Sequence, residues 1–594
     1  MYKRFVFFAL HFSLFFLSCK NPSKEKETAV TKNEQSKWWK EAVVYQLYPR
    51  SFQDSDGDGV GDIKGITQRL DYLKDLGINA IWLNPICASP NDDNGYDISD
   101  YRGIMKEMGT MADFDEMLEG MKKRNIKLIM DIVVNHSSDE HEWFKGAKSS
   151  RTNKFRNYYH WWPAENGTPP KRYSLFDENA DAWKFDSTTN SYYLHYFSRK
   201  QPDLNWENLV LRQEMYDMMK FWAEKGVSGF RLDAFPFMAK DTSWPAMPKD
   251  FTNEQFVRYY GADPKVHTYL KELHDQVLTK YDLYTVGEGG VIPFSKVAGY
   301  VEEDRKEIST LYHDELGNIW GRDSFDIGDY KVGKNNVVGL KQIVSKWDDK
   351  FISNGWNTVF FTNHDQSRAV SRYGNDAPEF REASAKMLHT FLLTQRATPY
   401  LYNGDEISMV NIRFKTVDEY NDLQTKNRYN LALKESKEAA AAYLQMQAEL
   451  SRDNSRTPMQ WNATATAGFT TGKPWLPLNQ NKTTVNVEVS EKDKNSILNY
   501  IRRMIALRNE NKAVLVYGKY ELLDAANPAV YAYTRTDGKN TFLIVLNFTK
   551  EMGKTAIPKG FGLAQELINN LQPLKVEGEN IVLQPYQAGV IKLE

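Results

Sequence analysis

The chain has 594 residues, too many for one small core and typical of a large fold with added domains. Its 76 Lys and Arg residues are balanced by 78 Asp and Glu residues, which gives a formal net charge of −2. This balance provides no basic surface for nucleic acid and excludes a nucleic-acid-binding function.

The first 36 residues have the pattern of an export signal followed by a linker. A basic start precedes the apolar stretch Phe5–Leu17, which is too short to span a membrane. The stretch leads to Cys19 through a site that resembles bacterial lipoprotein processing sites; the alternative is an ordinary secretory signal with a chance cysteine. We expect a signal peptide over residues 1–19, a flexible linker over residues 20–36, and an exported lipoprotein in the periplasm or at the outer membrane. The lipid on Cys19 would be its only membrane contact.

Short apolar runs typical of buried strands recur along the rest of the chain and alternate with helical patterns. Buried parallel strands that alternate with helices predict an α/β fold, a (β/α)8 TIM barrel, over residues 37–512. The predicted strands lie within Ala42–Pro49, Ala80–Pro85, Ile126–His136, Val227–Asp233, Tyr284–Glu288, Asn357–Asp365 and Thr398–Gly404.

Two segments depart from the barrel pattern. After His136 the periodicity weakens over a stretch too long for a bare loop, which predicts an inserted subdomain over about residues 137–206 after the third strand. Residues 513–594 contain short alternating strands and predict a C-terminal all-β domain, a β-sandwich. Helices are expected over Glu435–Leu450 and Ile497–Asn511, and no stretch past residue 36 is apolar enough to span a membrane.

Four of the predicted strands end in carboxylates or histidine. In a barrel, polar residues at the carboxyl ends of the strands favour a catalytic site, although unrelated capping groups are the alternative. Retaining glycoside cleavage needs two carboxyl groups ~5–5.5 Å apart, one as nucleophile and one as acid/base. Asp233 and Glu288 are the best candidates, and Asp365, next to His364, is a third carboxylate that can favour the transition state.

Arg231 lies two residues before Asp233, on the same face of its strand. We expect its guanidinium to keep Asp233 ionised, with a simple structural ion pair as the alternative. Partial burial of Glu288 would raise its pKa and keep a proton for general-acid catalysis. A catalytic metal is disfavoured because the histidines lack metal-ligand spacing.

The acidic loop Asp54–Asp62 has the pattern of half an EF-hand. Its carboxylates alternate along the loop and repel one another unless a hard cation screens them. Gly65 stands where an EF-hand has its bidentate Glu, so the motif is incomplete; a solvated acidic turn is the alternative. The sequence predicts a structural Ca²⁺ (or Mg²⁺) ion, bound by Asp54, Asp56, Asp58, the carbonyl of Val60 and Asp62.

The runs DIVVNH, GFRLD, VGE and FTNHD are similar to the four signature regions of glycoside hydrolase family 13, the α-amylase family. QPDLNW (Gln201–Trp206), NDDNGYDISDY (Asn91–Tyr101) and SRDNSRTPMQW (Ser451–Trp461) resemble its oligo-1,6-glucosidase and α-glucosidase branch. The resemblance implies Asp233 as nucleophile, Glu288 as acid/base and Asp365 as transition-state stabiliser. It also implies a glucosyl-binding set formed by Asp93, Tyr96, His136, Arg231, His364 and Arg452. Two segments depart from the family pattern, Asn403–Glu406 and Leu311–Asp323.

The resemblance implies a retaining, exo-acting α-glucosidase whose partner is an α-glucan oligosaccharide. In this branch the residue after the nucleophile is Val in α-1,6-specific enzymes and Ala or Thr in α-1,4-acting ones, and here it is Ala234. We therefore expect release of glucose from the non-reducing ends of maltose and short malto-oligosaccharides. An oligo-1,6-glucosidase is the main alternative, followed by a trehalose synthase and a non-catalytic sugar-binding lipoprotein. Pro202 argues against a trehalose-6-phosphate hydrolase, and the missing Arg-Leu-Asp-Arg-Asp motif argues against sucrose isomerisation.

Overall fold

The computed structural model describes residues 36–176, 181–248, 259–261, 264–313, 315–318 and 336–594. The predicted signal peptide, Cys19 and nearly all of the predicted linker lie outside the described residues. The chain divides into Met1–Lys37 and one compact unit, Trp38–Glu594, and the fold described below is that of the second unit.

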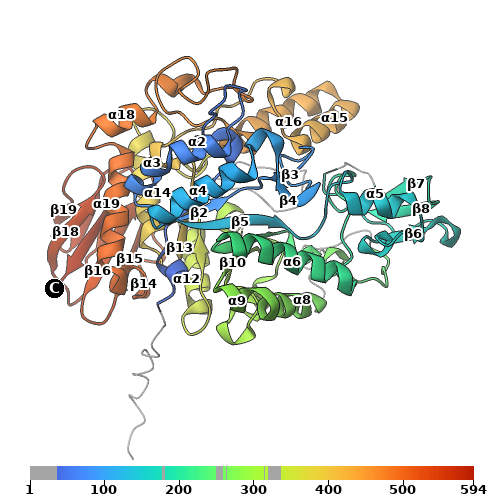
Figure 1. Ribbon diagram of the computed structural model, residues 1–594. Helices are drawn as coiled ribbons and strands as arrows, with labels where there is room; N and C mark the ends of the chain where they lie inside the picture. Colours follow the sequence, from blue (N-terminus) through green and yellow to red (C-terminus); the bar gives the residue numbers. More distant parts are fainter. Residues whose placement is uncertain (1–35, 177–180, 249–258, 262–263, 314, 319–335) are drawn as a thin grey trace, which may run out of the picture. The chain divides into compact units, whose positions relative to one another are not determined.

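Eight parallel strands of the described part form one sheet, in the order β11-β10-β9-β5-β2-β1-β13-β12 (Figure 1). The ends of this sheet meet, because the Thr358 hydroxyl of β12 donates to the Leu311 carbonyl of β11 at 3.0 Å. The predicted TIM barrel is confirmed. Its strands are β1 (Val44–Leu47), β2 (Ala80–Leu83), β5 (Lys127–Val133), β9 (Gly229–Asp233), β10 (Tyr284–Glu288), β11 (Thr310–Tyr312), β12 (Thr358–Val359) and β13 (Thr398–Tyr402).

The sequence prediction missed the sixth strand, β11. This strand has only 3 residues, too few to show a hydrophobic pattern, and it begins next to the segment that departs from the family. It pairs in parallel with β10, with Val286 opposite Thr310. Several predicted strands are also longer than the observed ones, because the polar residues at their ends leave the ladder and form the rim loops.

Helices cover the outside of the barrel, as expected for a chain that alternates strands and helices. They include α4 (Met111–Lys123), α6 (Leu209–Lys225), α8 (Lys265–Leu273), α12 (Val337–Phe351), α14 (Arg381–Thr394) and α19 (Ile497–Glu510). The last confirms the helix expected over Ile497–Asn511. The helix expected over Glu435–Leu450 is α16 (Lys437–Leu450), and Ser436 caps it and separates it from α15 (Leu423–Glu435). None of the helices in the described part is long and apolar enough to cross a membrane.

A small antiparallel sheet lies in the chain between β5 and β9. Its strands are β6 (Trp161–Pro163), β7 (Trp183–Asp186) and β8 (Ser191–Leu194), in the order β6-β8-β7. The loop that returns from it runs beside the rim of the barrel, where the Leu204 amide donates to the Asn135 carbonyl at 2.8 Å. The inserted segment therefore adds structure directly above the third strand.

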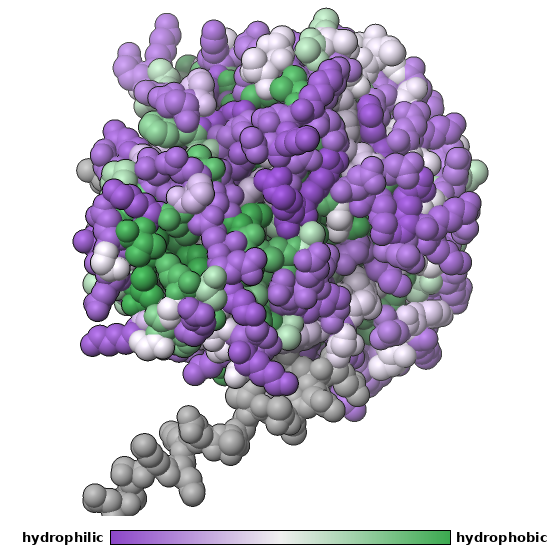
Figure 2. Space-filling view, turned by 90° about the vertical axis from the view of Figure 1, so that its left-hand side faces the viewer, coloured by the Kyte–Doolittle hydropathy of each residue, from purple (hydrophilic) through white to green (hydrophobic). Residues whose placement is uncertain are grey.

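The C-terminal segment is all-β and antiparallel, as predicted. Its five-stranded sheet has the order β14-β15-β16-β21-β18 and its three-stranded sheet the order β17-β20-β19. Figure 2 views the molecule from the side of these strands and shows hydrophobic residues gathered among polar ones. The large apolar side chains that this segment exposes are Met552, Phe561, Leu571 and Val576. The strands are β14 (Lys519–Leu523), β15 (Val530–Thr536), β16 (Thr541–Asn547), β17 (Gly553–Ala556), β18 (Leu563–Asn569), β19 (Lys575–Glu577), β20 (Asn580–Leu583) and β21 (Ala588–Leu593).

Buried arginine joins the C-terminal segment to the barrel. The Arg508 guanidinium on α19 donates to the carbonyls of Leu393 and Gln395 at 3.0 Å and of Ala397 at 2.7 Å. It also donates to the Leu515 carbonyl at 3.0 Å. These carbonyls would otherwise be buried without partners, so this one side chain satisfies the backbone hydrogen bonds of the turn that leads into β13.

The departing segment Asn403–Glu406 buries two adjacent carboxyl groups behind β13. Glu406 accepts hydrogen bonds from the hydroxyls of Tyr45 and Tyr72, both at 2.8 Å. Asp405 lies 4.0 Å from the Arg368 guanidinium. Burial raises the pKa of Asp405 to about 7, although Arg368 opposes the change.

Because the pKa of Asp405 is raised, ionisation of this carboxyl lowers the stability of the fold as the pH rises. Asp405→Asn removes this effect. A carboxyl with a raised pKa stabilises the fold at low pH, and this contribution is lost as the pH rises to about 7. Between pH 5 and pH 8 the free energy of unfolding of Asp405→Asn should therefore rise by about 3 kcal/mol relative to that of the wild type. Urea unfolding of both proteins across this range measures the difference, and parallel pH profiles would contradict the assignment.

Candidate active site

The polar residues that end the barrel strands lie together at the carboxyl-terminal rim. Asp233 ends β9, Glu288 ends β10 and Asp365 follows β12. β9 and β10 are neighbours, with Gly287 opposite Leu232. Parallel strands place their carboxyl ends on the same edge, so the structure brings the predicted acids to one rim.

The site is built around Arg231, whose side chain is 1% exposed. Its Nη1 donates to Asp131 Oδ1 at 3.0 Å and to Asp233, and its Nη2 donates to Glu288 Oε2 at 2.8 Å. Because these carboxylates come from β5, β9 and β10, one cation joins three neighbouring strands. The two carboxyls predicted to be catalytic are thus held on the two terminal nitrogens of a single guanidinium.

Three carboxylates around one guanidinium repel one another. Burial raises the pKa of Asp233 well above its ordinary value; Arg231 opposes this, and the charges of Glu288 and Asp131 add to it. Burial also raises the pKa of Asp131 to about 6 against the effect of Arg231. We expected Arg231 to keep Asp233 ionised, but without substrate the burial of Asp233 has the larger effect. The pKa of Asp233 is therefore raised in spite of the guanidinium beside it.

Asp365 is in the opposite electrostatic situation. It accepts hydrogen bonds from Arg452 Nη1 and Arg456 Nη2, both at 3.0 Å, and lies 3.0 Å from His364 Nε2. Burial opposes its charge, but the interactions with His364, Arg452 and Arg456 are stronger together and lower its pKa. Asp365 is thus ionised at neutral pH and positioned by two cations.

Tyr96 and His364 form the floor of the site. Their rings stack at 5.4 Å with an angle of 11° between the planes, and the Tyr96 hydroxyl donates to Asp131 Oδ2 at 3.0 Å. Burial lowers the pKa of His364 to about 3, so the ring is neutral at pH 7. The structure therefore places Tyr96 and His364 beside the Arg231 cluster, as the resemblance implied.

The remaining predicted sugar-binding residues form one wall. Gln201 Nε2 donates to Asp93 Oδ2 at 3.1 Å and lies 3.2 Å from His136 Nε2. Arg452 Nη2 lies 3.5 Å from Asp93 Oδ1. Burial lowers the pKa of His136 to about 3 and raises that of Asp93 to about 7, the latter against Arg452. All the residues predicted for the glucosyl site therefore lie in one connected set.

Sequence reasoning missed several residues that contact this set. Tyr312 on β11 receives a hydrogen bond from Arg231 Nη2, but its strand was not identified. Asp422 accepts from Arg452 Nε at 2.7 Å, and no motif marks it. Gln201 and Arg456 stand inside quoted motifs, QPDLNW and SRDNSRTPMQW, so those motifs contain the signal by which both could have been found.

The backbone beside the acids adopts conformations that small residues allow. Ala234, directly after Asp233, has φ of +46° and donates its amide to Glu288 Oε2 at 3.0 Å. A β-branched side chain is disfavoured at positive φ. A Cβ on Gly287, directly before Glu288, would lie 2.4 Å from the buried ring of Phe235. A β-branched side chain at position 234 and any side chain at position 287 are therefore disfavoured.

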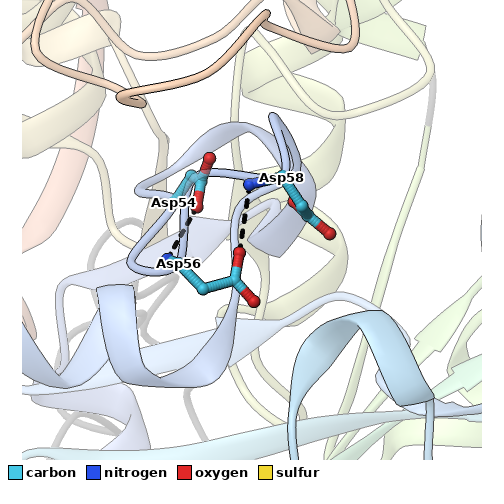
Figure 3. A group of neighbouring side chains, drawn as sticks. All are labelled: Asp54, Asp56 and Asp58. Carbon is cyan, nitrogen blue, oxygen red and sulfur yellow. Dashed lines mark hydrogen bonds between the residues drawn. The ribbon is translucent and has the colours of Figure 1, made fainter.

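The acidic loop brings three of its four carboxylates together. Oxygens of Asp54, Asp56 and Asp58 lie within 4.8 Å of one another, and the loop folds around hydrogen bonds to its own amides (Figure 3). Asp62 is used differently, because its oxygens accept from Ser55 and from the Gly65 amide at 2.7 Å, which caps α2 (Ile63–Gln68). The set Asp54, Asp56 and Asp58 suits a hard cation, and the side chain of Asp62 does not join it.

Comparison with known proteins places this geometry in a family. Residues 46–518 match the model of the alpha amylase catalytic domain, and residues 520–590 match that of the maltogenic amylase C-terminal domain. An oligo-1,6-glucosidase from Bacillus cereus is 45% identical over 94% of this chain and 100% of its own length. An alpha-glucosidase from Pediococcus pentosaceus is 41% identical over 94% of this chain and 99% of its own length.

A solved structure agrees with these relatives. The isomaltulose synthase from Klebsiella sp. LX3 has a TM-score of 0.90 and 43% sequence identity, and it covers 94% of this chain and 100% of its own. The barrel and the C-terminal strands thus have counterparts along nearly the whole chain. The chain belongs to glycoside hydrolase family 13, the α-amylase family, and is related to its oligo-1,6-glucosidases and α-glucosidases.

Proposed function

We propose that this protein is a retaining, exo-acting α-glucosidase that releases glucose from the non-reducing ends of short α-glucans. The observation that carries the proposal is the pair Asp233 and Glu288, held on the two terminal nitrogens of Arg231. Neighbours on one guanidinium are compatible with the ~5–5.5 Å spacing that a retaining mechanism needs, with no room for a water between the acids.

The two acids have different roles in the first half of this mechanism. Asp233 attacks the anomeric carbon as a carboxylate while a proton passes to the glycosidic oxygen from Glu288. Glu288 suits the leaving-group side, because its side chain is 33% exposed and that of Asp233 is 10% exposed.

Hydrolysis of the intermediate uses the same pair. Glu288 removes a proton from water as the water attacks the anomeric carbon, and Asp233 leaves as a carboxylate. Asp365, kept ionised by Arg452 and Arg456, binds sugar hydroxyls more strongly as the ring gains positive charge. The glucose product therefore keeps the α configuration.

Attack at chain ends requires a pocket that is closed beyond the first glucosyl unit. Arg452 supports such a closure, because it contacts Asp93 from the β2 side, Asp365 from the β12 side and Asp422 near α15. These contacts tie three distant segments together behind the Asp93–His136 wall. A longer glucan would have to break this network to pass through the site.

The two carboxyl roles can be separated by azide rescue. We expect Asp233→Gly and Glu288→Ala each to lower kcat for maltose by about 10³-fold or more. With an aryl α-glucoside and azide, Asp233→Gly should form the β-glucosyl azide, because azide takes the place of the nucleophile. Glu288→Ala should form the α-glucosyl azide from the covalent intermediate, and both products are identified by NMR. Exchanged products would reverse the roles, and full activity of either variant would refute the proposal.

Two linkages are candidates for the preferred substrate, α-1,4 and α-1,6. Ala234 favours α-1,4 substrates, whereas the names of similar relatives favour α-1,6 substrates. Ala234 packs in a buried apolar cluster with Tyr196, Phe237 and Tyr260, so a larger residue would displace the inserted segment next to the site. We propose the α-1,4 preference and retain oligo-1,6-glucosidase activity as the second candidate.

Parallel kinetics on maltose and isomaltose test this preference. We expect kcat/KM to favour maltose in the wild type, and Ala234→Val to lower the maltose-to-isomaltose ratio by about 10-fold or more. Ala234→Ser is the matched control, since its side chain is unbranched and close to that of alanine in size and should leave the ratio near the wild-type value. A wild type that prefers isomaltose would support the second candidate.

We also propose that the acidic loop binds a structural Ca²⁺ or Mg²⁺ ion through Asp54, Asp56 and Asp58. Repulsion supports the idea, because burial together with the charges of Asp56 and Asp54 raises the pKa of Asp58. A bound divalent cation would screen these charges and fix the loop against Thr470, whose hydroxyl donates to Asp54.

Removal of metal tests the cation site. A cation at 100 times its Kd adds about 2.7 kcal/mol of stability, so in a chain of this length a chelator should lower Tm by about 2 °C. Added Ca²⁺ should restore Tm. The double variant Asp56→Asn/Asp58→Asn should unfold at a lower temperature than the metal-bound wild type, and the chelator should not change its Tm. A wild type whose Tm does not change with the chelator would refute the cation site.

A further inference from the structure

A tyrosine on the sixth strand of the barrel lies against the acid cluster and takes no part in the proposed mechanism. Tyr312 is 5% exposed and ends β11, directly opposite Glu288 at the end of β10. Its carbonyl accepts the Gly289 amide at 2.9 Å, and its hydroxyl accepts a hydrogen bond from Arg231 Nη2. Tyr312 lies in the segment Leu311–Asp323, which departs from the family pattern, so no family motif assigns it a role.

Ring packing fixes the hydroxyl of Tyr312 in this position. The centre of its ring lies 5.9 Å from that of Trp82 and 5.6 Å from that of Phe360, and all three side chains belong to one buried apolar cluster. The central carbon of the Arg231 guanidinium lies 5.6 Å from the centre of the same ring. A phenylalanine would keep these ring contacts, so Tyr312→Phe removes only the hydroxyl.

The hydroxyl uses one of the four terminal N–H groups of Arg231, since each terminal nitrogen of a guanidinium carries two. Nη1 donates to Asp131 and to Asp233. Nη2 donates to Glu288 Oε2 at 2.8 Å and to Tyr312. Because the arginine side chain is 1% exposed, these N–H groups depend on acceptors in the protein. All four have an acceptor in this arrangement, and Glu288 receives one of them.

A neutral hydroxyl and a carboxyl group therefore share Nη2 of Arg231. Each N–H group that binds a carboxylate favours its charged form over its protonated form. Without the hydroxyl, the second N–H of Nη2 would be buried without its acceptor, and Glu288 is the other acceptor of Nη2 among the described residues. Glu288 would then receive both N–H groups and would lose its proton more easily.

We propose that Tyr312 is a positioning residue that accepts the second N–H of Arg231 Nη2 and so keeps Glu288 able to act as a proton donor. The assignment of Glu288 as the acid rests on the proposed function. The other titratable groups that act on Arg231 or Glu288 are the same in the wild type and in Tyr312→Phe. They are Asp131, Asp233, Tyr96, His364 and Asp365.

A comparison of two substrates tests this role. We expect Tyr312→Phe to move the basic limb of the kcat/KM profile for maltose about one pH unit lower, so that kcat/KM on that limb falls about 10-fold. The leaving group of α-glucosyl fluoride needs little protonation, so kcat/KM for this substrate should change by less than about 2-fold. Neither the ratio of the two substrates nor the position of the limb depends on the folded fraction, so a less stable variant still tests the proposal.

An unchanged limb, a limb moved to higher pH, or equal losses on both substrates would overturn the proposal. Tyr284→Phe is the matched control, because the Tyr284 hydroxyl is also buried in the barrel but bonds to Thr310 at 2.6 Å and to Tyr400 at 2.8 Å. This variant should lower Tm without a change in the limb or in the substrate ratio. The same shift in Tyr284→Phe would show a general packing effect and would also overturn the role of Tyr312.

Glu288→Ala separates this proposal from the proposed function. If Glu288 is the acid, this variant should lose kcat/KM for maltose and keep most of its kcat/KM for α-glucosyl fluoride. Equal losses on both substrates would refute the acid role of Glu288, and the role of Tyr312 with it. A selective loss in Glu288→Ala without the expected shift in Tyr312→Phe would overturn the role of Tyr312 alone.

Discussion

One buried cation determines the arrangement of this active site. The guanidinium of Arg231 is surrounded by carboxylates from β5, β9 and β10, and the barrel provides no other cation in direct contact with Asp131 or Asp233 among the described residues. Breaking such a cluster by removing its cation leaves several buried charges unpaired, which is strongly destabilising. The positions of the acids and the alignment of β5, β9 and β10 therefore both depend on Arg231.

The polar groups outside this cluster are connected in the same way, by cations that join loops. Arg452 contacts Asp93, Asp365 and Asp422, while Arg456 donates to the carbonyl of His364 and to Asp365. Together with His364, these arginines lower the pKa of Asp365 although burial opposes them, whereas burial raises the pKa of Asp233 beside Arg231. Two neighbouring regions of one rim thus shift the pKa values of their acids in opposite directions.

Most of the barrel and the acids of the site could be predicted from the sequence, because apolar runs that end in Asp, Glu or His are visible without a structure. The strand β11 could not, since three residues carry no periodicity, and with it Tyr312 was missed. Asp422 is held by Arg452 across a long sequence separation, which no local pattern reports. The raised pKa of Asp233 was also beyond the sequence, because it depends on how deeply the barrel buries that carboxyl and how closely Glu288 and Asp131 approach it. The predicted ligand Asp62 illustrates a similar limit, since a residue with the right spacing serves instead as a helix cap.

In the proposed mechanism Asp233 forms a covalent bond to glucose. A fluorinated glucosyl fluoride that reacts quickly and hydrolyses slowly traps such an intermediate, and peptide mass spectrometry then locates the sugar. We expect one glucosyl label per chain, on the peptide that carries Asp233, with the label lost in Asp233→Asn. A label on Glu288, or rapid turnover to a product of inverted configuration without any labelled peptide, would contradict it.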